Sequence, residues 1–203
     1  MELLGTIKDN RDLHKKVMGF CDIEIYPEIK KPEDMNGAMV YNMDGRALGC
    51  DGSGGEYILL NDNTIGFSSS EGECGRLAEN EIELFELLLN ISSFFDYNFV
   101  DLYADDELLK KYMTKREKDH VEFYNKNRIG DEKYENMQKY LSEKLSIKLY
   151  DNKFELLKRF HKTATREPQY SYIFTEKDGT KTNSEGSLIC RPLYEHVKKR
   201  MGL

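Results

Sequence analysis

The residues most suggestive of chemistry lie at 50–55, where the sequence reads CDGSGG. Ser53 is a potential nucleophile between glycines, and Asp51 is the nearest acid. A nucleophile elbow, however, needs glycines two positions before and two positions after the serine, and position 51 is aspartate. A catalytic serine also needs a histidine and an acid beside it, and three of the four histidines lie in the C-terminal half. We therefore predict no catalytic residues and expect a protein that is not an enzyme.

The same glycines could belong to a phosphate-binding loop. A P-loop ends in Gly-Lys-Ser or Gly-Lys-Thr and leads into a helix, so that backbone amides and a lysine surround the phosphates. Here the glycines lead into EYILL, a strand pattern, and residues 47–75 contain no lysine. The dinucleotide-binding fingerprint requires the same strand-to-helix context. We therefore predict no cofactor.

Carboxylates offer two candidate metal sites, Asp51 with Glu56 and the acidic run at 105–107. Neither has the ligand order of a calcium-binding loop, and a turn aspartate and an acidic helix start explain them more simply. The four histidines are not at ligand spacing, and the four cysteines form no CxxC pair. We predict no metal site. Scattered cysteines are typical of reduced thiols, so we expect a cytoplasmic protein.

Charge is distributed unevenly along the chain. Residues 47–109 contain 14 acidic residues and one basic residue, Arg76, for a net charge of −13, whereas the remainder carries +6. Phosphate repels carboxylates, so an acidic middle argues against nucleic-acid binding. It favours a basic protein partner, whose approach it would accelerate. The alternative, a solvated helix face with its loops, is equally consistent with the sequence.

The elements that position these residues follow from periodicity and turn signals. From 38 to 78, short segments rich in β-branched, aromatic and aliphatic residues alternate with DGR, DGSGG and NDN, which predicts an antiparallel meander of three to five strands. The GSGG bend would then be a bulge or a crossing point in the sheet. Six glycines are assigned a structural role: Gly52, Gly54, Gly55, Gly66, Gly72 and Gly75.

Helical spacing begins after Asn80, which we predict to be an N-cap. An apolar stripe on this helix would cover one face of the sheet, as expected of a helix packed on an antiparallel sheet. The residues predicted to face inward are Ile82, Phe85, Leu88 and Leu89.

The flanking regions follow the same logic. A short helix is predicted at 9–19, and Pro27 and Pro32 mark a connector after it. Residues 104–164 are predicted to be helical, and 171–182 to form a hairpin with a turn at Asp178-Gly179. Pro192 would open a last helix. No stretch reads as a signal peptide or is apolar enough to span a membrane, so we expect no membrane association.

The run ALGCDGSGGEYILLNDNTIGFSSSEGECGRLAENEIELFELLLN resembles the central cassette of the SUKH superfamily, the bacterial immunity proteins related to fungal regulators of cell-wall synthesis. The likeness rests on the DGSGG bend before a strand, the NDNT turn, the SSEGE-x-GR-x-AE segment and the acidic helix, and it covers residues 46–97. The resemblance implies an α+β fold with a mostly antiparallel twisted sheet. We expect one domain over 1–203, with the sheet and covering helix at about 37–97 and a helical C-terminal extension at about 98–203.

The resemblance also implies a function without catalysis. Bacterial members of the superfamily bind and neutralise polymorphic toxins, often nucleases, so we expect a protein partner, a basic toxin domain, that is blocked by occlusion. The alternative is a regulatory scaffold without a toxin, like the fungal relatives. We expect the partner-binding residues to be acids near the covering helix with two tyrosine anchors, although core packing is the more common role of tyrosine. They are Glu71, Glu73, Glu79, Glu81, Glu83, Glu86, Tyr97 and Tyr103.

Overall fold

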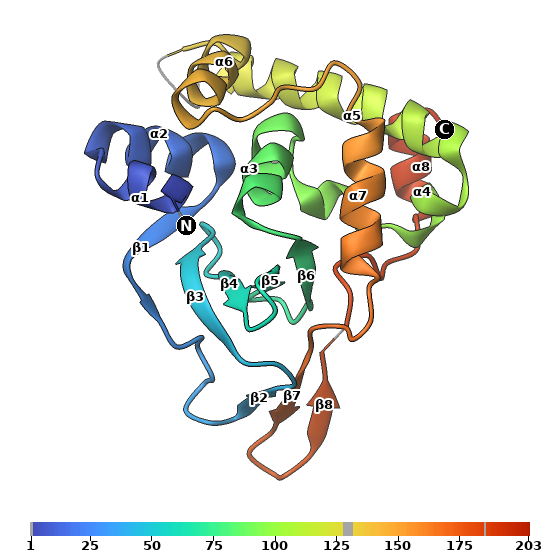
Figure 1. The fold of residues 1–203 in the computed structure, drawn as a ribbon. Helices are drawn as coiled ribbons and strands as arrows, with labels where there is room; N and C mark the ends of the chain where they lie inside the picture. The colour runs from blue at the N-terminus through green and yellow to red at the C-terminus, as the bar shows by residue number, and fades with distance from the viewer. Residues whose placement is uncertain (1, 128–131, 185) are drawn as a thin grey trace.

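The computed structural model describes residues 2–127, 132–184 and 186–203. The chain forms an α+β fold, and most of its helices follow the strands of the main sheet (Figure 1). In the described ranges there are eight α-helices: α1 (Glu2–Lys8), α2 (Arg11–Cys21), α3 (Glu81–Asn90), α4 (Val100–Ala104), α5 (Asp106–Asn127), α6 (Tyr134–Leu145), α7 (Phe154–Ala164) and α8 (Glu195–Met201). A short 3₁₀ helix, η1 (Phe94–Tyr97), links α3 to α4.

The main sheet has five antiparallel strands in the order β1-β3-β4-β5-β6. They are β1 (Glu24–Lys30), β3 (Gly45–Cys50), β4 (Glu56–Leu60), β5 (Ile65–Ser68) and β6 (Cys74–Ala78). The run from β3 to β6 is the predicted meander, because each strand pairs with the next one along the chain. The antiparallel arrangement expected from the turn chemistry is therefore confirmed.

A second sheet joins distant parts of the chain. Its three strands, β2 (Met39–Tyr41), β7 (Tyr172–Thr175) and β8 (Lys181–Asn183), lie in that order and are antiparallel. The predicted hairpin at 171–182 is present as β7 and β8, and Gly179 at its tip has a φ of +88°. The first predicted strand of the meander, β2, lies in this small sheet and pairs with β7.

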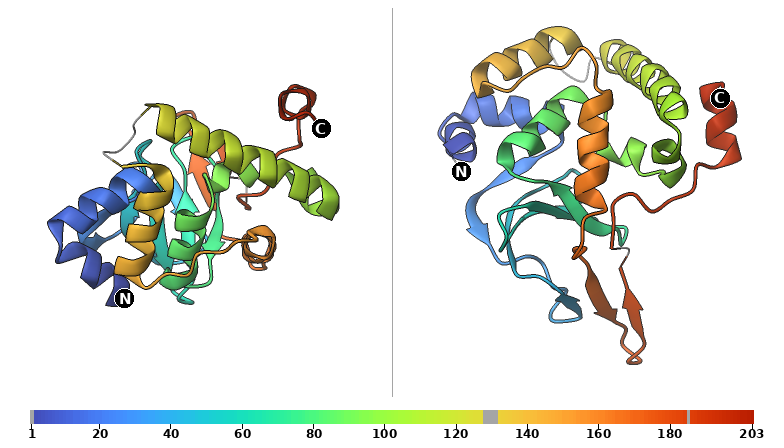
Figure 2. Two further views of the ribbon diagram at one scale, coloured as in Figure 1. Left: turned by 90° about the horizontal axis from the view of Figure 1, so that it is seen from above. Right: turned by 45° about the vertical axis from the view of Figure 1, so that its right-hand side comes forward.

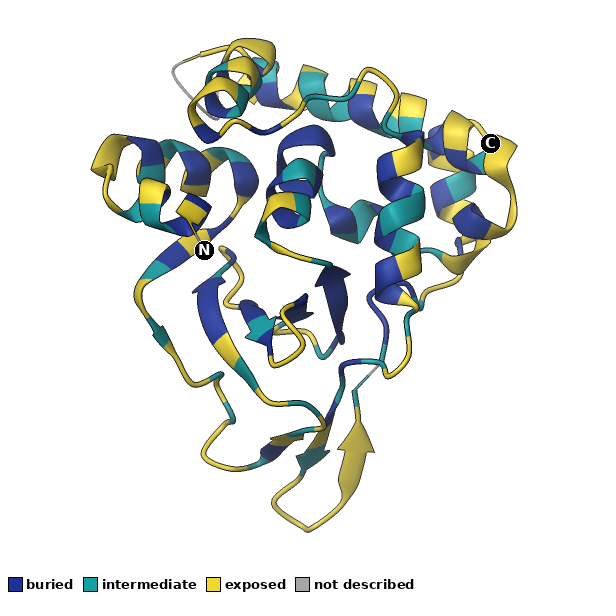
Figure 3. Cartoon of the chain, viewed as in Figure 1, coloured by how far each residue is buried: buried dark blue, intermediate teal, exposed yellow. Residues whose placement is uncertain are grey.

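The main sheet lies between two layers (Figures 1 and 2). Helices cover one face, and the small sheet approaches the other. Strand β4 is buried on both faces: Tyr57 belongs to the large core that also contains the helices, whereas Ile58 belongs to a small core shared with Tyr170 and Tyr172. Figure 3 shows that β6 is buried along its length, while β8 is exposed. The large core runs from Leu3 to Met201 and therefore includes both ends of the chain.

The prediction that DGSGG is a turn between two strands is confirmed, whereas the prediction of a bulge or crossing point at this block was wrong. Cys50 pairs with Glu56, so residues 51–55 form the turn between β3 and β4. The Asp51 carboxylate accepts hydrogen bonds from the backbone N–H groups of Ser53 (2.9 Å) and Gly55 (2.8 Å). Gly54 has a φ of +90°, which favours glycine at this position. The register shift between β3 and β4 lies instead between Ala47 and Gly49.

Several helix predictions are confirmed. Asn80 caps α3, since its side chain accepts a hydrogen bond from the backbone N–H of Glu83 (3.0 Å). Phe85, Leu88 and Leu89 are buried as predicted, but Ile82 is 47% exposed because the buried stripe of α3 passes through Leu84 and Leu87 instead. Residues 104–164 contain α5, α6 and α7, residues 146–153 between α6 and α7 are not helical, and the prediction for 128–131 lies outside the described residues.

The N-terminal region departs most from prediction. The connector expected around Pro27 is strand β1, and α1 precedes the predicted first helix. Proline has no backbone N–H to donate to a neighbouring strand, so Pro27 argued against a strand here. Because β1 is an edge strand with an irregular register, it tolerates the proline. The last helix, α8, begins at Glu195, three residues after Pro192. In the described ranges, none of the helices combines the length and apolar character needed to cross a bilayer.

Candidate functional site

The acids of α3 pair with basic residues of α7. Arg159 contacts the carboxylates of Glu83 (3.2 Å) and Glu86 (2.8 Å), and Glu86 also accepts a hydrogen bond from the Tyr150 hydroxyl (2.9 Å). Arg166, just after α7, pairs with Glu79. The excess negative charge of residues 47–109 is therefore partly neutralised by basic residues of the C-terminal half.

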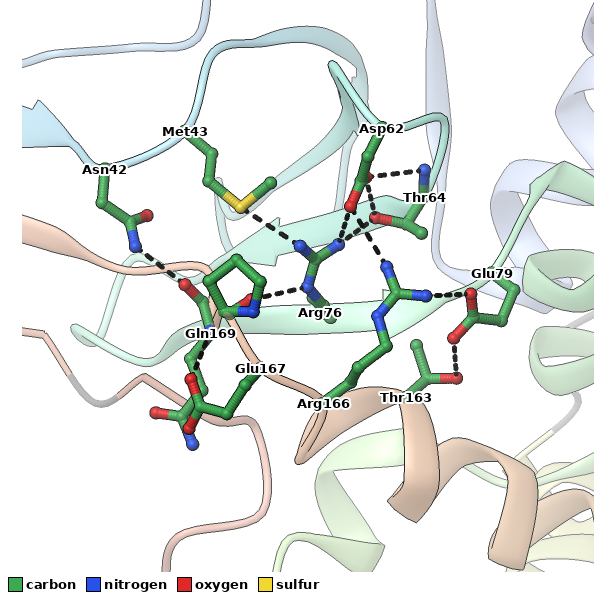
Figure 4. A network of polar contacts seen from close by, with 11 residues as sticks. Asn42, Met43, Asp62, Thr64, Arg76, Glu79, Thr163, Arg166, Glu167 and Gln169 are labelled. Carbon is green, nitrogen blue, oxygen red and sulfur yellow. Dashed lines mark hydrogen bonds and ion pairs between the residues drawn. The ribbon is translucent and has the colours of Figure 1, made fainter.

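A second set of ion pairs is centred on Arg76, the one basic residue of the acidic segment (Figure 4). Its guanidinium, on β6, is 1% exposed, contacts the Asp62 carboxylate at 2.8 Å and donates to the carbonyl of Pro168 at 2.9 Å. Asp62 also contacts Arg166 at 3.1 Å. Since Asp62 lies in the β4–β5 turn, the network joins the main sheet to the chain between α7 and β7.

Tyr97 is not a surface anchor, contrary to prediction. It is 0% exposed, and its hydroxyl donates to the carboxylate of Glu117 on α5 at 2.7 Å. Burial, together with the charge of Glu117, raises the pKa of Tyr97, so the hydroxyl stays protonated and remains a donor. Glu117 also accepts from the N–H of Ser92 (3.0 Å) and contacts Lys153 (2.8 Å). This buried acid therefore holds three segments together.

Tyr103 is also part of the core rather than of a rim. It is 9% exposed, its hydroxyl donates to the carbonyl of Tyr97 at 2.9 Å, and its ring stacks on His161 at a centroid distance of 4.4 Å. Burial raises the pKa of Tyr103 and lowers that of His161. Core packing, the alternative that the sequence left open, is what these two tyrosines do.

A groove lies between the small sheet and the segment that leads into α8. Its volume is about 550 Å³. One wall is the face of β7 and β8 that carries Phe174 and Thr182, and the other is formed by the β5–β6 turn and residues 190–194. We call it the β7–β8 groove. Its lining residues are Glu71, Gly72, Glu73, Tyr172, Phe174, Glu176, Thr182, Asn183, Ser184, Cys190, Arg191, Pro192 and Tyr194.

Hydrogen bonds fix the floor of the β7–β8 groove. Arg191 forms an ion pair with Glu73, which is itself buried. The Tyr172 hydroxyl donates to the carbonyl of Gly72 at 3.3 Å, and burial, with the nearby Cys74 thiol, raises the pKa of Tyr172 so that it remains a donor. The β5–β6 turn is therefore held against β7 through Tyr172 and against residues 190–194 through Arg191.

The groove is negatively charged. Its three carboxylates, those of Glu71, Glu73 and Glu176, face one guanidinium, that of Arg191. Among the residues that the structure describes, the Glu71 and Glu176 side chains make no hydrogen bond or ion pair. Tyr194 at the rim is 46% exposed and stacks on His196. The groove thus combines unneutralised acids with aromatic surface, which suits a cationic, partly apolar ligand.

The sequence predicted two of the groove acids, Glu71 and Glu73, and missed Glu176 and the aromatic walls. Phe174 lies 77 residues after the end of the cassette at residue 97, and Tyr194 lies 97 residues after it. The pairing of β2 with β7, which places Phe174, leaves no local signal in the sequence. Glu81, on the first turn of α3, lines a different hollow with Ile82 and Arg46. In the described part of the chain, no group of three or more metal-ligating side chains comes together.

Comparisons with known proteins found no match. No protein-family model, no curated protein and no solved structure is similar to this chain at a significant level.

Proposed function

We propose that the chain is a non-enzymatic protein-binding module with a SUKH-like fold, an immunity protein that neutralises a bacterial polymorphic toxin by occlusion. The cassette at 46–97 that resembles the superfamily is the part that forms β3 to β6 and α3. This continuous antiparallel sheet with one covering helix is what the resemblance implies. The proposal therefore rests on the sequence resemblance, and the α+β architecture supports it.

The observation that carries the proposed mode of action is the acidic β7–β8 groove. Glu71 and Glu176 have no counter-ion among the described residues, and Phe174 and Tyr194 supply aromatic surface beside them. A toxin that acts on nucleic acid presents basic groups to its substrate, and an acidic groove complements them. We assign the contact to this groove rather than to α3, because Glu83 and Glu86 are already paired with Arg159.

A protection assay tests the function. The toxin domain encoded next to the chain's gene would be induced in a bacterial host, with and without this protein. We expect growth to be rescued by the wild type and lost with the double variant Glu71→Lys/Glu176→Lys. The matched control, Glu122→Lys/Glu143→Lys, makes the same charge change on exposed positions of α5 and α6 and should still rescue growth.

The alternative is a regulatory scaffold without a toxin. A gene neighbourhood that lacks a toxin would favour this alternative. Failure of the wild-type protein to rescue growth, although it accumulates as a folded protein, would refute the immunity proposal. Equal rescue by the groove variant would instead refute the assignment to the β7–β8 groove.

A further inference from the structure

Strand β8 has a free edge. It is the last strand of the small sheet and pairs only with β7 among the described elements. Backbone hydrogen bonds between Glu176 and Thr180 (2.8 Å) and between Ser184 and Tyr172 (2.9 Å) bracket the ladder. Hydrogen-bonded and non-hydrogen-bonded pairs alternate in an antiparallel ladder, so Phe174 and Thr182, two residues from each bracketing pair, are also a hydrogen-bonded pair. The backbone N–H and C=O groups of Thr182 therefore point toward β7. Lys181 and Asn183 therefore direct their backbone N–H and C=O groups away from the sheet.

The β7–β8 groove reaches this free edge. Phe174 and Thr182 are register partners and lie on the groove side of the small sheet. Asn183 pairs with Ile173, so its side chain belongs to the other side, yet Asn183 also lines the groove. The groove therefore extends to the backbone at the edge of β8.

A strand added at this edge would place alternate side chains in the groove. Successive residues of a strand point to opposite faces, so every second side chain of an added segment would lie on the side of Phe174 and Thr182. The carboxylates of Glu71 and Glu176 lie in that groove without a counter-ion among the described residues. A lysine or arginine of the added segment would complement them.

We propose that the protein binds an extended basic segment of its partner by β-augmentation, with the segment pairing to the β8 edge at Lys181 and Asn183 and a basic side chain entering the groove. The inference rests on the proposed protein-binding function and specifies its mode. Main-chain hydrogen bonds supply affinity in this mode of recognition, and the groove that receives alternate side chains supplies specificity. The small sheet would become four-stranded in the complex.

Peptide selection tests this mode with a defined probe. Two libraries of nine-residue peptides, random except for a central Lys or a central Glu, would be selected on the immobilised full-length protein. We expect enrichment from the lysine library, with β-branched residues at alternate positions, and at least tenfold weaker recovery from the glutamate library. Equal recovery from both libraries, or none from either, would overturn the inference.

A matched pair of variants isolates the backbone contact. Asn183→Pro removes the outward N–H without removing a bond to β7, whereas Asn183→Ala removes the side chain and keeps the N–H. We expect the selected peptides to bind the alanine variant within twofold of wild type and the proline variant at least tenfold more weakly. N-methylation of alternate peptide residues should cause the same loss without any change in the protein, so a misfolded variant cannot imitate the result.

The two proposals fail separately. If the selected peptides bind Asn183→Pro and Asn183→Ala equally, and N-methylated peptides also bind, β8 is only a short edge protected by Lys181. That result overturns the β-augmentation inference even where the wild-type chain protects cells against the toxin.

Discussion

The two acidic regions of the molecule differ in how their carboxylates are paired. Around α3, Glu79, Glu83 and Glu86 are paired with arginines from the C-terminal half. At the β7–β8 groove, Glu71 and Glu176 face solvent without a counter-ion among the described residues. The acids around α3 already form ion pairs within the protein, whereas the acids of the groove, which lie beside aromatic surface, remain available to a partner. We therefore separate the acids that stabilise the fold, here called structural acids, from those that we propose to bind the partner, here called binding acids.

The largest expected effect concerns the network around Arg76. Arg76→Ala removes a buried guanidinium from the carbonyl of Pro168 and from the Asp62 carboxylate, which keeps its contact with Arg166. Hydrogen bonds to a charged group contribute about 1.5–3 kcal/mol each, so we expect a loss of about 3 kcal/mol in the free energy of unfolding. Urea denaturation measures the loss. Arg46→Ala, an exposed position on β3, is the control and should change little. A small loss in the free energy of unfolding for Arg76→Ala would show that the network contributes little to joining the main sheet to the chain between α7 and β7.

Tyr97 and Tyr103 offer a comparison within the core. Tyr97→Phe removes a hydrogen bond to the Glu117 carboxylate, and we expect it to cost about 1.5–3 kcal/mol, the range for bonds to charged groups. Tyr103→Phe removes a bond to a neutral carbonyl and should cost about 0.5–1.5 kcal/mol. Thermal denaturation of both variants gives the order. A larger loss for Tyr103→Phe than for Tyr97→Phe would show that the hydrogen bond to Glu117 is not the stronger of the two.

Arg159 tests the pairs between α3 and α7. The side chain is 39% exposed, so solvent screens its contacts with Glu83 and Glu86, and we expect Arg159→Ala to cost about 1 kcal/mol or less. Because such pairs are screened, the loss should shrink when the salt concentration is raised. The matched control is Lys118→Ala, which breaks an exposed pair with Glu122 within α5 and should cost less. A loss that is independent of salt would contradict this role.

The smallest effect on stability is expected at the groove. Glu71→Lys/Glu176→Lys should leave the urea midpoint unchanged, since neither carboxylate bonds to the described part of the protein. A clear drop in the midpoint would show that these acids also stabilise the fold, and the distinction between the two regions would fail.

Local patterns in the sequence predicted the caps and turns, which depend on residues close together along the chain. Asn80 caps α3, and Asp178-Gly179 forms the hairpin tip, because each acts on its immediate neighbours. The missed features depend on distance along the chain: β2 pairs with β7, about 130 residues later, and Glu86 meets Arg159, 73 residues later. The charge excess of 47–109 was visible in the sequence, but its neutralisation by α7 required the fold. Strand β1 was missed because Pro27 lies within it, and a proline argues against a strand.

The most direct test of the separation between structural and binding acids is the affinity of the proposed partner, a basic toxin domain, for two charge-reversal variants. Isothermal titration calorimetry would compare Glu71→Lys/Glu176→Lys with Glu83→Lys/Glu86→Lys under conditions where both are folded. We predict that the groove variant binds at least tenfold more weakly than wild type, a loss of about 1.4 kcal/mol, while the α3 variant binds within threefold of it. Loss of affinity in the α3 variant, with the groove variant unchanged, would contradict the account.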